Sequence, residues 1–187
     1  GLAPAVRRLA LALGLALSLS ACGINSVPTA EENAKAKWAD VEAQFQRRAN
    51  LIPNLAEVTQ GAAANERAIL TEVTEARARA TSVSVTANDL GNAEKMAEFQ
   101  AAQAQLGAGI GRLLASFEAY PQIQSNQNFL ALQSQLEGTE NRIAVAIRDY
   151  NEAVRQYNTT IRTFPDIIGA KVIHGAEPLV PYEAVTE

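Results

Sequence analysis

A repeat of apolar positions, spaced alternately three and four residues apart, constrains this 187-residue chain more than any other feature. The repeat runs from Trp38 to Ala80, and it returns from Met96 to Phe117 and from Phe129 to Phe164. Side chains three and four residues apart share one face of an α-helix, so the spacing predicts long helices packed into a bundle. Abundant alanine and few aromatic residues suit such packing. We therefore expect an all-α fold, an antiparallel up-down bundle of three to four long helices over residues 31–165.

Proline and glycine interrupt the repeat at two places. Pro53 removes a backbone hydrogen bond, so residues 38–80 form either one helix kinked near Ala49 or two helices that meet there. The repeat keeps its phase across Pro53, which favours one kinked helix. The second helix, about residues 93–119, contains glycines at 107, 109 and 111. These glycines indicate either a locally weak helix or close packing against a neighbouring backbone.

The third helix is expected from about residue 126 to residue 163, where Pro165 stops it. After it, residues 166–187 form a tail. The tail contains apolar positions at 167–168 and 172–173, and it contains prolines at 178 and 181. We expect a short helix or an extended segment lying on the bundle, followed by a frayed end.

The first 22 residues have the layout of a lipoprotein-type signal peptide. Arg7 and Arg8 precede an uncharged apolar run over residues 9–19, and Leu19-Ser20-Ala21-Cys22 follows. This ending resembles a bacterial lipobox, which implies that Cys22 carries a lipid such as palmitate and becomes the mature N-terminus. The alternative is an uncleaved membrane helix over about residues 9–27, whose second half is weakened by serine and asparagine. Either anchor tethers the chain to a membrane and leaves the rest of the chain outside the cytoplasm. Residues 23–30 would be a linker. Of the two anchors, we favour the lipid.

Composition argues against several classes of function. The net charge is −4 and no block of basic residues is present, so we expect no nucleic-acid partner. One cysteine and one histidine, His174, cannot supply the three or four ligands of a Cys/His zinc site. They also exclude Ser/His/Asp and Cys/His nucleophilic arrangements. We predict no metal, no cofactor and no catalytic residue.

Several polar residues lie on the predicted core stripes. Glu66 and Glu140 need partners there, because a buried carboxylate without one is costly. Arg48, Arg142 and Arg148 can supply the opposite charge. We favour a buried ion-pair network that sets helix register over an acid/base pair in a groove.

Tyrosine-asparagine pairs recur one heptad apart, as Tyr150-Asn151 and Tyr157-Asn158. Asparagine on a packing stripe commonly fixes how helices pair, at some cost in stability. We therefore add Asn151 and Asn158 to the predicted structural network. Lining a pocket is the alternative role for these four side chains.

Taken in order, the motifs resemble the LemA family of bacterial envelope proteins over about residues 38–170. The matching residues are Trp38, Arg47-Arg48-Ala49-Asn50-Leu51-Ile52-Pro53-Asn54-Leu55, Glu118-Ala119-Tyr120-Pro121, Phe129, Leu132-Gln133, Leu136, Glu140-Asn141-Arg142-Ile143-Ala144, Arg148, Tyr150-Asn151, Tyr157-Asn158 and Phe164-Pro165. The resemblance implies an antiparallel helical bundle behind an N-terminal membrane anchor, and it supplies no catalytic residue. Family members typically carry a plain transmembrane helix, where this chain has a lipobox-like Cys22.

Three functions remain open on these observations. The first is a non-enzymatic, membrane-tethered scaffold of the cell envelope that binds other envelope proteins or copies of itself. The second is a small-molecule binder or enzyme with a polar pocket around Glu140, Arg142 and Tyr150. The third is an adaptor of a membrane protease, which rests on the envelope setting of the family alone. We favour the scaffold.

Overall fold

The chain folds into an all-α structure, which confirms the predicted fold class. The computed structural model describes residues 2–60, 63–163, 167, 171 and 175–183, apart from the side chains of residues 19–25 and 64. The helices are α1 (Leu2–Val58), α2 (Ala64–Ser82), α3 (Ala93–Ser116), α4 (Pro121–Gln124) and α5 (Gln127–Thr160). Two short 3-10 turns, η1 (Ala87–Asp89) and η2 (Phe117–Ala119), lie in the connections. No strand occurs in the described part of the chain.

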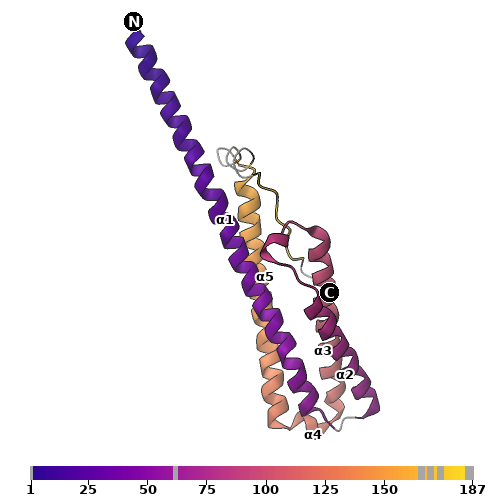
Figure 1. Ribbon diagram of the computed structural model, residues 1–187. Helices are drawn as coiled ribbons and strands as arrows, with labels where there is room; N and C mark the ends of the chain where they lie inside the picture. The colour runs from indigo at the N-terminus through magenta and orange to yellow at the C-terminus, as the bar shows by residue number, and fades with distance from the viewer. Residues whose placement is uncertain (1, 61–62, 164–166, 168–170, 172–174, 184–187) are drawn as a thin grey trace.

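The four long helices run alternately up and down, and α4 lies across one end (Figure 1). Helix α1 packs along α5 and also against α2, and α2 packs along α3. The N-terminal part of α1 projects past the other helices, at the end opposite α4 (Figure 1). The molecule is therefore a four-helix bundle with one helix far longer than the others.

Helix α1 passes through Pro53 without a break. A proline has no N–H to give to the carbonyl four residues earlier, which here is that of Ala49. Arg77 of α2 makes good the loss, because its Nε donates to the Ala49 carbonyl oxygen at 2.8 Å. The neighbouring helix thus satisfies the group that the proline leaves unpaired.

The prediction of a single helix up to residue 80 was wrong. Helix α1 ends at Val58, and α2 begins at Ala64 and runs in the opposite direction. Both helices bury the same stripe, with Ile52 and Leu55 before the turn and Val73 and Ala76 after it. A regular repeat reports which face is buried and does not report a change of direction, so the turn was invisible in the spacing. Residues 23–30, expected as a linker, are also helical and belong to α1.

The core divides into two layers along the bundle. The layer nearer α4 contains Leu55, Leu106 and Phe129 among others. The other layer is aromatic and gathers around Trp38, which is 1 % exposed and whose Nε1 donates to the carbonyl oxygen of Val85 at 2.8 Å. Its further ring members are Phe45, Phe99, Tyr150 and Tyr182. Tyr182 comes from the C-terminal tail, so the tail completes the core and does not merely lie on it.

Candidate functional site

Arg48 links three helices from inside the bundle. Its side chain is 4 % exposed, and Nη1 donates to Oε1 of Glu140 on α5 at 3.0 Å. Its Nη2 donates to both the backbone oxygen and the side-chain oxygen of Gln103 on α3, at 2.8 and 3.0 Å. The guanidinium carbon lies 5.1 Å from the ring centre of Phe45. One cation therefore fixes the register of α1, α3 and α5.

Two of the glycines in α3 provide close packing. A Cβ at Gly107 would stand 3.1 Å from Nη1 of Arg48, and one at Gly109 would stand 3.2 Å from Cγ2 of Val73. Gly111 has no atom within 4 Å of the same position. The first two thus support the close-packing alternative, and the third does not.

Glu140 itself is not buried, contrary to our expectation. Its side chain is 54 % exposed, and the core position one residue earlier belongs to Thr139, which is 1 % exposed. The predicted stripe passed from Leu136 to Glu140. The buried stripe passes from Leu136 to Thr139 and then to Ile143, which is an equally regular spacing of three and four residues. The carboxylate instead reaches inward from the rim of the bundle to meet Arg48.

The remaining charged members of the predicted network lie apart from Arg48. Arg142 is exposed, and its Nη2 donates to Oγ1 of Thr139 at 3.3 Å. Glu66 is half-buried at the start of α2, and its hydrogen bond with the Tyr120 hydroxyl raises the pKa of that tyrosine. The structure therefore brings Arg48 and Glu140 together, and it places Glu66 and Arg142 in other surroundings.

Asn151 and Asn158 bind the C-terminal tail, and not a neighbouring helix. The carboxamide of Asn151 accepts from the N–H of Tyr182 and donates to its carbonyl oxygen, each at 2.8 Å. Asn158 holds Leu179 in the same way, at 2.9 and 3.0 Å. Each asparagine thus pairs with both backbone polar groups of one tail residue. We call the surface that receives residues 179–182 the tail groove.

Two further contacts complete the tail groove. The Tyr150 hydroxyl donates to the carbonyl oxygen of Val180 at 2.7 Å, and the N–H of Val180 donates to the carbonyl oxygen of Leu90 at 2.8 Å. Burial raises the pKa of Tyr150, and it raises the pKa of Tyr182 to about 12. The tail is therefore held between α5 on one side and the connection from α2 to α3 on the other. The recurrence of Tyr-Asn was the sequence signal for this groove, but it did not name the tail as the partner.

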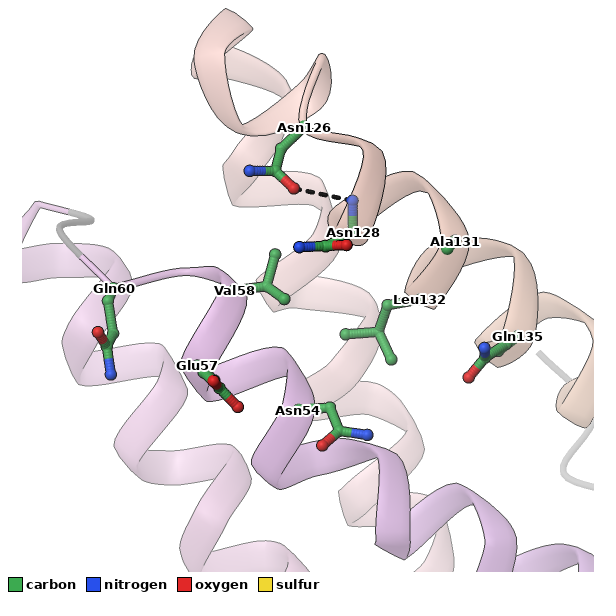
Figure 2. A pocket seen from close by; sticks show the side chains of 9 residues that line it. All are labelled: Asn54, Glu57, Val58, Gln60, Asn126, Asn128, Ala131, Leu132 and Gln135. Atoms are coloured by element: carbon green, nitrogen blue, oxygen red, sulfur yellow. Dashed lines mark hydrogen bonds between the residues drawn. The ribbon is translucent and has the colours of Figure 1, made fainter.

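A polar hollow of about 590 Å³ lies at the α4 end of the bundle, between the end of α1 and the start of α5 (Figure 2). Val58 and Leu132 form its apolar part. Asn126 is engaged, because its side-chain oxygen caps α5 by accepting from the N–H of Asn128 at 2.9 Å. The other polar lining residues are Asn54, Glu57, Gln60 and Gln135. Most of these polar groups are carboxamides, which offer both donors and acceptors, and Glu57 adds one carboxylate, so the hollow is suited to binding polar groups.

The three residues of the alternative pocket do not converge. Glu140 points to Arg48, Arg142 to Thr139, and Tyr150 to the tail. A shallow hollow on α5 includes Glu140 but neither Arg142 nor Tyr150. Among the described residues, no group of three or more His, Cys, Asp or Glu is placed to hold a metal ion. His174 lies outside the described residues.

The projecting part of α1 is apolar and uncovered. Over residues 2–18 every side chain is exposed, and the leucines at positions 9, 11, 13, 15 and 17 are 65–72 % exposed. Among the side chains of α1 that the structure describes, Val27 is the first one that is buried. Cys22 lies in the helix between these regions, but its side chain is outside the described part. Over the stretches that the structure describes, no helix has the length and apolar character needed to cross a membrane.

Comparison with known proteins agrees with the resemblance noted from the motifs. The model of the LemA family matches residues 37–187. The chain is 30 % identical over 158 residues to Magnetosome protein MamQ 2 and to Magnetosome protein MamQ 1 of Paramagnetospirillum magneticum. It is 29 % identical over 157 residues to Magnetosome protein MamQ of Magnetospirillum gryphiswaldense. Each match covers 75 % of this chain and 58 % of the relative, so the chain spans little more than half of their length.

Proposed function

Since the chain belongs to the LemA family, we propose that it is a membrane-tethered, non-catalytic helical scaffold of the bacterial cell envelope. The observation that carries this proposal is the exposed apolar stretch of α1, residues 9–18, in a helix that continues into the bundle. Apolar patches of that size on a protein surface mark sites that another protein or a membrane covers. A membrane is the natural cover for an uninterrupted helical stretch behind Arg7 and Arg8.

The lipid anchor is the finer part of the proposal. In the precursor, the stretch before Cys22 enters the membrane; after cleavage, a lipid on the Cys22 sulfur takes over as the anchor. About 30 helical residues separate Val27 from the end of α1, a rise of roughly 45 Å. The α4 end of the bundle would then stand well away from the membrane surface. There it would present the polar hollow and the outer helix faces to partners.

The hydrogen-bond partners of the polar residues favour a scaffold over an enzyme. The partners of these hydrogen bonds lie in the same chain for Arg48, Asn151 and Asn158. Such contacts set the position of helices and of the C-terminal tail, so these three side chains have a structural role. The magnetosome relatives are named for a location and not for a reaction, which agrees with a structural role.

The anchor is tested by metabolic labelling with an alkyne analogue of palmitate, together with the mass of the N-terminal peptide. The unaltered chain should carry the label and begin at Cys22, whereas Cys22→Ser should carry no label. Ser26→Ala, a small change four residues further on, serves as the matched control and should be labelled normally. An unlabelled chain that keeps residues 1–21 in the membrane fraction would establish the uncleaved helix instead.

The scaffold role is tested by cross-linking in intact cells, followed by purification in mild detergent. The tethered protein should retain specific envelope proteins or further copies of itself. A charge on the exposed surface of α5, Val145→Glu, should reduce this recovery; Val145 is 45 % exposed. Recovery of no protein above the background of an untagged strain would contradict the proposal.

A further inference from the structure

The tail groove holds an extended segment by hydrogen bonds to the backbone of that segment, as peptide-binding sites do. We propose that it is such a site, and that the ligand it accepts in trans is the Leu179–Tyr182 segment of a second copy of this chain. The inference deepens the self-association included in the proposed function, and it rests on that function for the setting in which copies meet.

The geometry of the groove explains why the asparagines stand one heptad apart. Seven residues of α-helix rise about 10.5 Å, and three residues of extended chain span about 10 Å. Asn151 and Asn158 can therefore face Tyr182 and Leu179 at the same time, with the tail running antiparallel to α5. Two carboxamides on one helix act as the edge of a strand would act, because each offers one donor and one acceptor to one residue.

Contacts with the side chains of the tail add specificity to these backbone hydrogen bonds. Tyr182 is 6 % exposed, and its ring centre lies 5.7 Å from that of Phe45 and 6.5 Å from that of Trp38. Leu179 packs against the apolar cluster formed by Val27, Tyr157 and Ile161. Between them, Pro181 is exposed and has no N–H to satisfy. The ligand class is therefore an extended segment with an aliphatic residue at its first position and tyrosine at its fourth.

The second copy is favoured as the source because this segment is the one seen to fit. Every copy carries both the groove and the segment, so exchange between two copies keeps all the contacts of the closed chain. An empty groove would expose the aromatic layer around Trp38 and leave the two carboxamides without their partners. Copies tethered side by side on one membrane raise the local concentration of tails, which favours exchange further.

The test mixes two forms of the full chain, purified in detergent. The donor carries a photoreactive diazirine analogue of leucine at position 179 and a distinguishing tag. The acceptor is Tyr182→Ala, whose own tail has lost its anchor. Illumination should give a cross-linked heterodimer in at least tenfold higher yield than with the unaltered acceptor. Mass spectrometry should map the cross-link to α5 near Asn158. Because the test needs no membrane, failure of the lipid anchor would leave its result unchanged.

Two controls define the outcomes. Adding Asn151→Leu and Asn158→Leu to the acceptor should abolish the heterodimer while the helical content stays the same. If Tyr182→Ala does not fold, Leu179→Ser opens the other end of the tail and leaves the aromatic layer in place. Cross-links found within the donor alone would overturn the proposal. A heterodimer that maps outside the tail groove, or that persists without the asparagines, would also overturn it.

Discussion

Replacing Arg48 by alanine should destabilise the bundle by about 3–5 kcal/mol, the usual cost of removing a large buried side chain together with its hydrogen bonds. The side chain is 4 % exposed and makes one hydrogen bond to Glu140 and two to Gln103. Its removal leaves the oxygens of Gln103 without this donor and opens a void beside Phe45. No nearby cation is placed to replace it among the contacts described for Gln103.

Glu140→Ala should cost less, about 1–2 kcal/mol. It leaves the buried guanidinium without its carboxylate, but the half-exposed position lets water reach Nη1 of Arg48. The Glu140 side chain is 54 % exposed, and Nη2 of Arg48 keeps its bonds to Gln103 after the change. Arg48→Ala is therefore expected to lower the free energy of unfolding more than Glu140→Ala does. The double variant should be close to Arg48→Ala alone, since the carboxylate then has no cation to bind.

Urea unfolding of the full chain in mild detergent measures these values. Circular dichroism reports the helices, and Trp38, the single tryptophan, reports the aromatic layer. Arg47→Ala is the matched control, because Arg47 is the exposed neighbour of Arg48 and should change the free energy of unfolding by less than about 0.5 kcal/mol. Equal costs for Arg48→Ala and Glu140→Ala, or an Arg48→Ala variant as stable as Arg47→Ala, would refute the reasoning.

Four further substitutions test other contacts. Arg77→Ala should cost about 1–2 kcal/mol in the same assay, because it leaves the Ala49 carbonyl unpaired; no change would show that water replaces the guanidinium. Gly107→Ala should lower the melting temperature, because its Cβ would press on the buried guanidinium, whereas Gly111→Ala meets open space and should stabilise the helix by up to about 1 kcal/mol. The pKa of Tyr182 is raised from an unfolded value of about 10 to about 12, so its contribution to stability is complete below pH ~10 and is lost as the pH rises to ~12. Tyr182→Phe should therefore lose less stability than the unaltered chain between about pH 9 and about pH 11.5, and an identical loss would contradict the assignment.

The helices of the bundle could be predicted from the sequence because periodicity reports burial directly. The expected helices over residues 93–119 and 126–163 correspond closely to α3 with η2 and to α5. The reversal after Val58 could not be found in this way. The buried positions on α1 and α2 continue one repeat in phase, and a turn between two helices leaves no mark in such a repeat.

The position of Glu140 shows a second limit. Both Thr139 and Glu140 satisfy a helical spacing from Leu136, and sequence alone does not say which of them faces the core. A straight α-helix has 3.6 residues per turn, so a stripe drifts and two neighbouring positions can both qualify. Packing decides between them: the small Thr139 fits the interior, where its hydroxyl donates to the Gln135 carbonyl oxygen at 2.8 Å.

The Tyr-Asn pairs show what a regular polar spacing can and cannot reveal. A seven-residue interval suits contact between two helices, and it also suits contact with three residues of extended chain, because both spans are about 10 Å. Asn151 and Asn158 were assigned to helix pairing on the first basis, and the structure shows the second. The distinction follows from chemistry. Backbone groups inside a helix are already paired, whereas an extended segment presents free N–H and C=O groups that a carboxamide can satisfy. A polar heptad repeat on a helical bundle is therefore also a reason to search the chain for an extended segment that it could hold.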